Sequence, residues 1–169
     1  MQLSKNSGQA GTSLIEATIA ACTSAMFLGS LFAMNMTAMK TMRTAREAGG
    51  ASQVLQQRVE TLRIANWHQI TDAVWLRNNL MNTAPSGGDI LKGMTETLTL
   101  VPYGSTTTGN TQLIRDSSGT TQIVSQNSAL LTESAMKVIW TVAYSGGLKG
   151  DPVTRQTVAI LAKGGVAKW

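Results

Sequence analysis

A long stretch without charge dominates the pattern of hydrophobic and polar positions near the start of this chain. From Ala17 to Met39 no charged residue occurs, and alanine, methionine, leucine and phenylalanine make up most of the segment. As a helix it would rise about 1.5 Å per residue and reach roughly 35 Å, more than the hydrocarbon core of a bilayer, which measures about 30 Å. The pattern predicts a helix that can cross a membrane.

Two other interpretations of this segment stay open on composition alone. A secretory signal peptide has an apolar region of roughly 7 to 15 residues and a small-residue cleavage site; this segment is longer and meets no Ala-x-Ala site before Lys40. A buried core helix is the second alternative. The many small residues, among them Ala17, Ser24 and Gly29, favour close packing against other helices.

Helical periodicity continues beyond the apolar segment. Leu55, Val59 and Leu62 recur at i, i+4 and i+7, and Ala48 and Ala51 extend that face backwards. The other face carries polar residues, which are Gln56, Gln57, Glu60 and Arg63. We expect one helix over residues 12–66, with a membrane-spanning half at 12–39 and an amphipathic half at 40–66.

Two local features refine this helix. Arg43 with Glu47, and Glu60 with Arg63, have the spacing of weak ion pairs along a helix. Each glycine of Gly49-Gly50 costs about 1 kcal/mol relative to alanine in a helix interior. The glycine pair therefore predicts a bend or local melting.

Residues 67–169 have the pattern of a globular head. A short helix is predicted over 67–80, and Pro85-Ser-Gly-Gly88 breaks the chain after it. Alternating residues predict four strands, which lie at 95–101, 122–125, 137–144 and 154–162. Turn-forming residues at 145–152 join the last two strands as an antiparallel hairpin. The predicted class is α+β, with a long N-terminal helix packed on a small antiparallel sheet.

Charge and cysteine content narrow the choice of partners. The formal net charge is +5, but the Lys and Arg residues are scattered apart from Lys40, Arg43 and Arg46. This scatter argues against a nucleic-acid partner. Cys22 is the only cysteine, so no disulfide can form within the chain.

Residues suited to catalysis or metal binding are sparse. His68 is the only histidine and Cys22 the only cysteine, which excludes a three-ligand His/Cys zinc site and leaves a Ser-His-Asp triad dependent on that one histidine. Asp116 and Asp151 could offer oxygens to calcium, but no cluster of acids surrounds them in sequence, so a turn is the preferred interpretation of Asp116. We expect no enzymatic activity, no metal site and no cofactor.

The start of the chain carries the most specific motif. Gly11-Thr12-Ser13-Leu14-Ile15-Glu16 follows a short polar leader with one lysine and precedes the apolar segment. It resembles the processing site of type IV prepilins and pseudopilins. The resemblance implies a leader at residues 1–11, cleavage after Gly11 by a prepilin peptidase that also methylates the new amine, and a mature chain that begins at Thr12.

The same resemblance implies a purpose for Glu16, the fifth residue of the mature chain. A carboxylate near the membrane costs on the order of 2 to 4 kcal/mol unless it has a partner. In the family this glutamate neutralises the N-terminal amine of a neighbouring subunit, so that pairing accompanies assembly. The alternative is that Glu16 lies solvated among lipid headgroups and has no role.

The family also implies a fold, a location and a set of partners. Residues 51–63 and the closing residues 157–169 are similar to segments of minor pilins and pseudopilins. We therefore expect a pilin-like fold and a minor subunit of a type IV pilus or a type II secretion pseudopilus. Its partners would be other pilin or pseudopilin subunits, the prepilin peptidase and methyltransferase, the inner-membrane assembly platform and membrane lipid.

The orientation of the chain in the membrane and its function each have an alternative. The family implies an anchor in the bacterial inner membrane with the head on the non-cytoplasmic side. Lys5 alone precedes the span and three basic residues follow it, so the positive-inside count by itself favours the opposite orientation. An alternative function is a DNA-binding or adhesive minor pilin whose scattered basic head residues contact the ligand.

Overall fold

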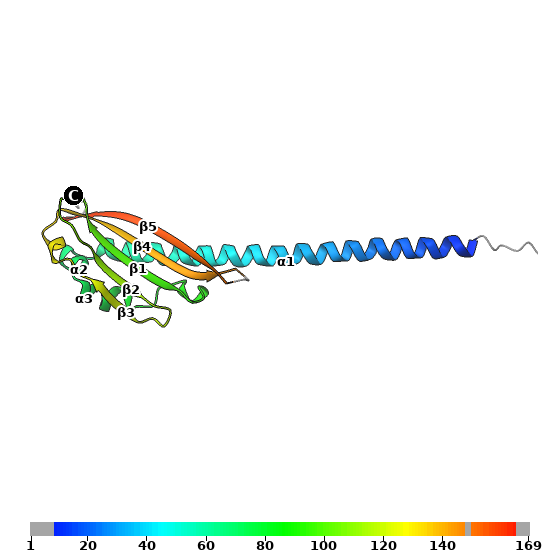
Figure 1. The fold of residues 1–169 in the computed structure, drawn as a ribbon, viewed down its shortest axis with the longest axis horizontal. Coiled ribbons are helices and arrows are strands. Elements are labelled where there is room, and N and C mark those ends of the chain that lie inside the picture. Colours follow the sequence, from blue (N-terminus) through cyan, green and yellow to red (C-terminus); the bar gives the residue numbers. More distant parts are fainter. Residues whose placement is uncertain (1–8, 148–149, 165–169) are drawn as a thin grey trace, which may run out of the picture. The chain divides into compact units, whose positions relative to one another are not determined.

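A long N-terminal helix and a five-stranded antiparallel sheet make up most of the protein (Figure 1). The computed structural model describes the backbone of residues 9–147 and 150–164, with side chains from residue 13 onward. The chain divides into two compact units, Met1–Met42 and Arg43–Trp169. Helix α1, Gln9–Ile64, contributes to both units. The coarse α+β prediction is confirmed.

The end of α1 differs slightly from the predicted residue 66, and Asn66 explains the difference. Its side chain accepts a hydrogen bond from the Gln69 amide at 3.0 Å, and the Gln69 side chain accepts one from the Asn66 amide at 3.0 Å. This reciprocal capping box starts a new helix at Trp67. Asn66 therefore caps the following helix and does not belong to α1.

The segment predicted as one helix over 67–80 is divided in three. It forms α2 (Trp67–Thr71), α3 (Ala73–Trp75) and a π-helical turn, η1 (Leu76–Met81). Asp72 causes the first break, because its backbone is extended and its side chain accepts a hydrogen bond from the Val74 amide at 2.8 Å. The prediction of a single helix is wrong because aspartate is a better helix cap than a helix interior residue.

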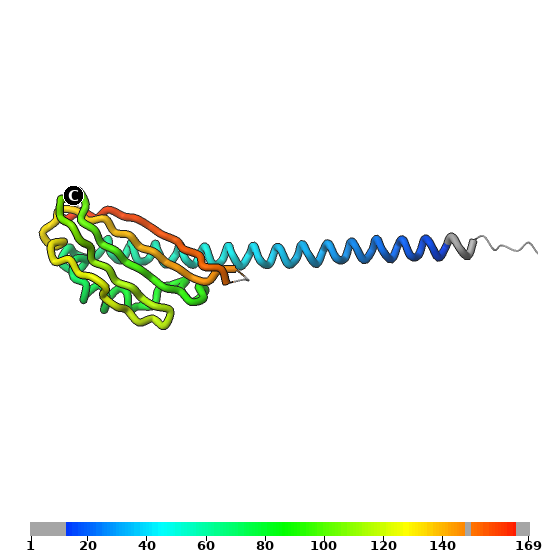
Figure 2. Tube along the Cα trace, viewed as in Figure 1, coloured from blue at the N-terminus to red at the C-terminus, as the bar shows by residue number. Residues whose placement is uncertain are grey.

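The sheet has the strand order β3-β2-β1-β4-β5, and every neighbouring pair is antiparallel. Figure 2 follows the chain through this sheet. The bounds of the strands are β1 Thr95–Pro102, β2 Thr111–Arg115, β3 Thr121–Ser125, β4 Ala135–Gly146 and β5 Asp151–Ala162. Four of these strands are the predicted ones, and the predicted hairpin joins β4 to β5.

Two details of the sheet differ from the sequence analysis. Strand β2 was not predicted, because Leu113 and Ile114 are adjacent and point to opposite faces, which leaves too little alternation to recognise. The predicted loop at 145–152 is shorter, since Ser145 pairs with Pro152 and Gly146 with Asp151. A proline fits there because β5 lies at the sheet edge and needs no amide on its open side.

The core lies between the second half of α1 and one face of the sheet. The helix contributes Ala51, Val54, Leu55 and Leu62, and the strands contribute Leu98, Leu100, Leu113, Val138, Trp140 and Val142. The face of α1 that is buried differs from the predicted face by a small rotation about the helix axis. Val59 lies at its edge and is half-buried, whereas Val54 and the charged residue Arg58 are buried.

Helix α1 passes through Gly49-Gly50 without interruption, so the predicted melting is wrong. Gly50 is buried beneath the turn that contains Gly87, and a Cβ atom on Gly50 would lie 2.9 Å from the Gly87 carbonyl oxygen. The amide of Ser86 donates to the Gln57 side chain at 2.7 Å and holds the same turn against the helix. Gly50 thus permits close backbone contact, which offsets its low helix propensity.

The glycine pair supplies a matched test of this contact. Gly50→Ala should destabilise the protein by about 1 to 3 kcal/mol, because the methyl group meets backbone that cannot yield easily. Gly49→Ala should stabilise it by up to about 1 kcal/mol, because Gly49 is exposed with open space around it. Denaturant unfolding of the full chain in detergent measures both changes. Equal changes in stability from the two substitutions would contradict the role of Gly50 in close backbone contact.

Candidate functional site

The first unit presents an apolar helical surface. Every side chain from Ser13 to Met42 is exposed in the single chain. These include large hydrophobic residues, among them Leu14, Ile19, Phe27, Leu31, Phe32 and Met39. The helix is long and apolar enough to cross a membrane, with a mean hydropathy of 1.6 in its most apolar window. An apolar surface of this extent is a candidate contact for lipid or other helices.

Most hydroxyl groups of this segment are satisfied within the helix. The side chains of Thr18, Ser30 and Thr37 donate to the carbonyl oxygens of Ile15, Phe27 and Ala33 at 2.8, 2.7 and 2.9 Å. Thr23 donates to the carbonyls of Ile19 and Ala20 at 3.0 Å. Since the hydrocarbon core of a bilayer offers no hydrogen-bond partners, such internal bonds suit a membrane environment.

The predicted processing and assembly positions lie at the beginning of this surface. Gly11 and Thr12 fall in the helical backbone of α1, just before the first described side chain at Ser13. Glu16 is exposed and makes no hydrogen bond or ion pair with the described residues. Cleavage after Gly11 and pairing of Glu16 with another subunit therefore stay predictions. The transmembrane bounds Ala17 and Met39 both lie within α1.

Glu47 links α1 to the β4–β5 turn. The predicted ion pair with Arg43 is confirmed at 2.8 Å, but Glu47 is buried, which the sequence analysis did not anticipate. Its carboxylate also accepts a hydrogen bond from the Gly147 amide at 2.8 Å. This backbone bond, followed by the bond from Arg43, lowers the pKa of Glu47 below the usual glutamate value. The carboxylate thus holds the turn to the helix in its ionised form.

A buried ion pair joins α1 to the sheet. Arg58 donates to both carboxylate oxygens of Glu96 at 2.9 Å, and the exposed fractions of the two side chains are 3% and 0%. Arg115 on β2 donates to the same carboxylate at 3.2 Å. The Trp140 indole donates to it at 3.3 Å, and the Arg58 guanidinium lies 5.7 Å from the centre of that ring.

This cluster was missed from the sequence, although two signals were present. Arg58 lies on the helix face between Val54 and Leu62, and Glu96 has the strand parity of Leu98 and Leu100. One charge on each apolar face is what a buried pair requires. The remaining Arg58 donors bond the carbonyls of Leu80 and Thr83, so the guanidinium is well satisfied. We assign the cluster a structural role.

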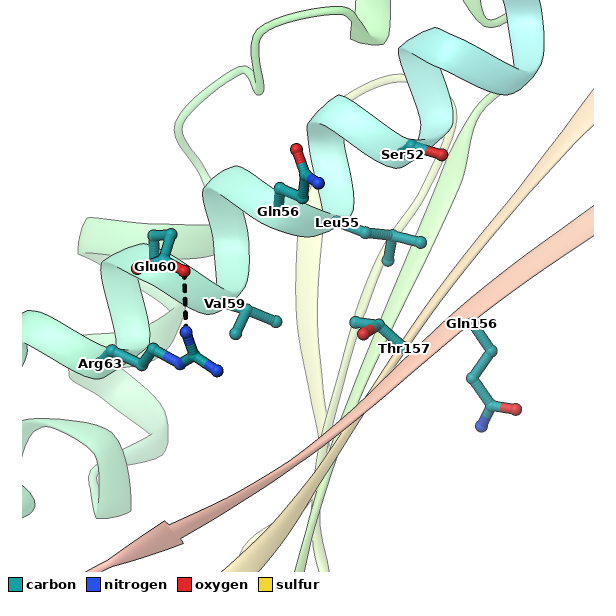
Figure 3. Close-up of a pocket in the computed structure, with 8 residues that line it drawn as sticks. All are labelled: Ser52, Leu55, Gln56, Val59, Glu60, Arg63, Gln156 and Thr157. Carbon is teal, nitrogen blue, oxygen red and sulfur yellow. Dashed lines mark hydrogen bonds and ion pairs between the residues drawn. The ribbon is translucent and has the colours of Figure 1, made fainter.

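An open groove of about 350 Å³ lies between α1 and the edge strand β5 (Figure 3). Leu55 and Val59 point from the helix toward Thr157 on the strand. Glu60 and Arg63 form the predicted ion pair at 2.9 Å along the helix wall. The groove offers apolar contact and one neutralised charge pair.

The residues considered for catalysis or metal binding do not come together. His68 is exposed on α2, and Asp151 is exposed at the start of β5. Asp116 accepts hydrogen bonds from the Ser118 hydroxyl and from the Ser118 and Thr120 amides, which lower its pKa and confirm the turn interpretation. Within the described residues, no three His, Cys, Asp or Glu side chains are grouped as metal ligands.

Comparisons of the chain with protein-family models, with curated proteins and with solved structures find no match. The functional proposal therefore depends on the motif around Gly11 and Glu16 and on the physical properties of α1.

Substitutions of two arginines in α1 test how much the buried Arg58–Glu96 pair contributes to the free energy of unfolding. Arg58→Met should cost about 3 to 5 kcal/mol, because it leaves the buried carboxylate of Glu96 without its main partner. The control is Arg63→Met, which removes an exposed ion pair and should cost less than about 1 kcal/mol. Denaturant unfolding measures both changes. Similar losses for the two variants would refute the distinction.

Glu47 should contribute an acid-dependent part of the stability. Its pKa is lower in the folded chain than in the unfolded chain, so its contribution is complete above the unfolded value of about 4.3 and is lost as the pH falls through the lowered folded value. In Glu47→Gln this contribution is absent. We expect the stability of wild type to fall more steeply than that of the variant below about pH 4, measured by unfolding at several pH values. If the stability of the two proteins fell in parallel with pH, Glu47 would not contribute this acid-dependent stability.

Proposed function

We propose that the chain is a prepilin-like structural subunit, processed after Gly11 and assembled as a minor component of a type IV pilus or a type II secretion pseudopilus. One observation carries the proposal. A single helix, α1, joins an exposed apolar segment that begins at Ala17, directly after Glu16, to an amphipathic half packed on an antiparallel sheet. This combination suits the pilin-like fold that the resemblance implies.

The two halves of α1 have different physical requirements. The second half buries its apolar face within the head. The first half has no such cover, and most of its hydroxyls are bonded internally, so its stable surroundings are lipid or the helices of other subunits. A subunit that is first held in the bacterial inner membrane and then packed into a filament core meets both environments in turn.

Glu16 supplies an interaction that favours the movement of the subunit from the membrane into the filament. Cleavage after Gly11 would expose a positive amine at Thr12, four residues before a carboxylate that lacks a partner among the described residues. In an assembled array the amine of one subunit can neutralise the carboxylate of its neighbour, which offsets the cost of placing either charge in apolar surroundings. The partners are then other subunits, the prepilin peptidase, the assembly platform and lipid, with the head on the non-cytoplasmic side.

The intact mass of the chain from membranes of its native host tests the processing step. We expect a mature chain that begins at Thr12, with an added methyl group on its amine. A chain that still begins at Met1 in a host with an active prepilin peptidase would indicate an ordinary membrane anchor and would overturn the proposal.

A substitution tests the role of the carboxylate in assembly. Glu16→Ala should leave cleavage after Gly11 intact but reduce recovery of the subunit in the sheared filament fraction at least several-fold, because the neighbouring amine loses its counter-charge. The matched control is Glu60→Ala, which removes an exposed glutamate later in the same helix. Normal incorporation of Glu16→Ala would show that the carboxylate has no part in assembly.

A further inference from the structure

Two polar side chains in the apolar segment lack internal partners. The hydroxyls of Thr18, Thr23, Ser30 and Thr37 bond to carbonyls of their own helix. Ser24 and Asn35 are exposed and make no side-chain hydrogen bond within the described chain. An unpaired carboxamide in hydrocarbon is costly, because no water is present to satisfy it. A polar partner from a second helix would remove this cost for Asn35.

Ser24 and Asn35 also share one face of α1. Asn35 lies eleven positions after Ser24, which at 3.6 residues per turn brings the two within about 20° of each other around the helix axis. Both residues belong to a series of positions spaced alternately by four and by three residues. The series consists of Ala17, Ala21, Ser24, Leu28, Leu31, Asn35 and Ala38. This is the heptad spacing of a helix seam, with a carboxamide at one core position.

We infer that this seam pairs α1 with a parallel second copy of the chain in the membrane, before filament assembly. A parallel identical helix brings a second Asn35 to the same depth and a second Ser24 to the depth of the first. A carboxamide has both a donor and an acceptor, so two Asn35 side chains can satisfy each other. Alanines at positions 17, 21 and 38 allow the helices to approach closely.

The seam is separate from the proposed assembly contact. Glu16 lies one position before Ala17, which places it about 100° around the helix from that residue. The carboxylate thus lies outside the paired face, and a membrane dimer leaves it accessible to a neighbouring amine. The inference rests on the proposed membrane insertion of α1, but it depends on neither cleavage nor filament formation.

Cysteine cross-linking tests which face is paired. In a Cys22→Ser background in lipid vesicles, Ala38→Cys lies on the seam and Ala33→Cys lies on the opposite side of α1. Mild oxidation should produce a disulfide-linked dimer with Ala38→Cys and several-fold less with Ala33→Cys. Equal cross-linking of the two alanine positions would overturn the assignment of the face.

Sedimentation equilibrium of the full chain in detergent micelles tests the role of the carboxamide. Asn35→Leu should raise the dissociation constant of the dimer about 3- to 20-fold, and Asn35→Gln should restore part of the loss. The matched control, Thr37→Val, removes a hydroxyl that bonds within its own helix and should change the constant less than about twofold.

Two results would overturn the inference. One is an unchanged dissociation constant for Asn35→Leu, and the other is a chain that stays monomeric at every protein-to-detergent ratio. Neither result affects the proposed function, because the micelle experiment uses no peptidase and no filament. Failure of the proposed function would instead appear as an uncut N-terminus in the native host, whether or not the dimer forms.

Discussion

The buried pair between Arg58 and Glu96 is the constraint on which the head depends. Each charge lies on an otherwise apolar face, so α1 and β1 can pack only where the two groups meet at 2.9 Å. The same guanidinium bonds the carbonyls of Leu80 in η1 and of Thr83 just after it, which ties both to the helix. One side chain thereby sets the rotation of the helix and the position of two other elements. This rotation also leaves Val59 at the rim of the groove beside β5.

Polar side chains in the two halves of α1 meet different surroundings. In the second half, Glu47, Arg58 and Gln57 bond to turns and strands of the head. In the apolar half, the hydroxyls of four residues are bonded internally, namely Thr18, Thr23, Ser30 and Thr37, whereas Glu16, Ser24 and Asn35 have no described partner. A folded head does not require these three groups, and the hydrocarbon core of a bilayer offers no partner for such groups. Both proposals rest on this difference, since each supplies the missing partner from another copy of the chain.

Local patterns in the sequence had different predictive value. The uncharged segment, the amphipathic stripe and four strands were predictable because periodicity reports burial directly. The single helix at 67–80 failed at Asp72, where a side-chain cap outweighed the surrounding apolar spacing. Gly50 was misjudged because helix propensity takes no account of the Gly87 carbonyl, which approaches from a distant turn. Of the candidate site, the motif at 11–16 was evident from sequence, and the groove was not.

The sequence by itself determined the approximate extent of α1, its division into apolar and amphipathic halves, the α+β class and the positions of Gly11, Thr12 and Glu16. These follow from residue order, because helix and strand periods depend on neighbours along the chain. Only the tertiary structure decided that Glu47 and Arg58 are buried, that β5 forms the sheet edge and that a groove lies beside it. Those properties depend on which distant segments meet, and the partner of Arg58 lies 38 residues away along the chain.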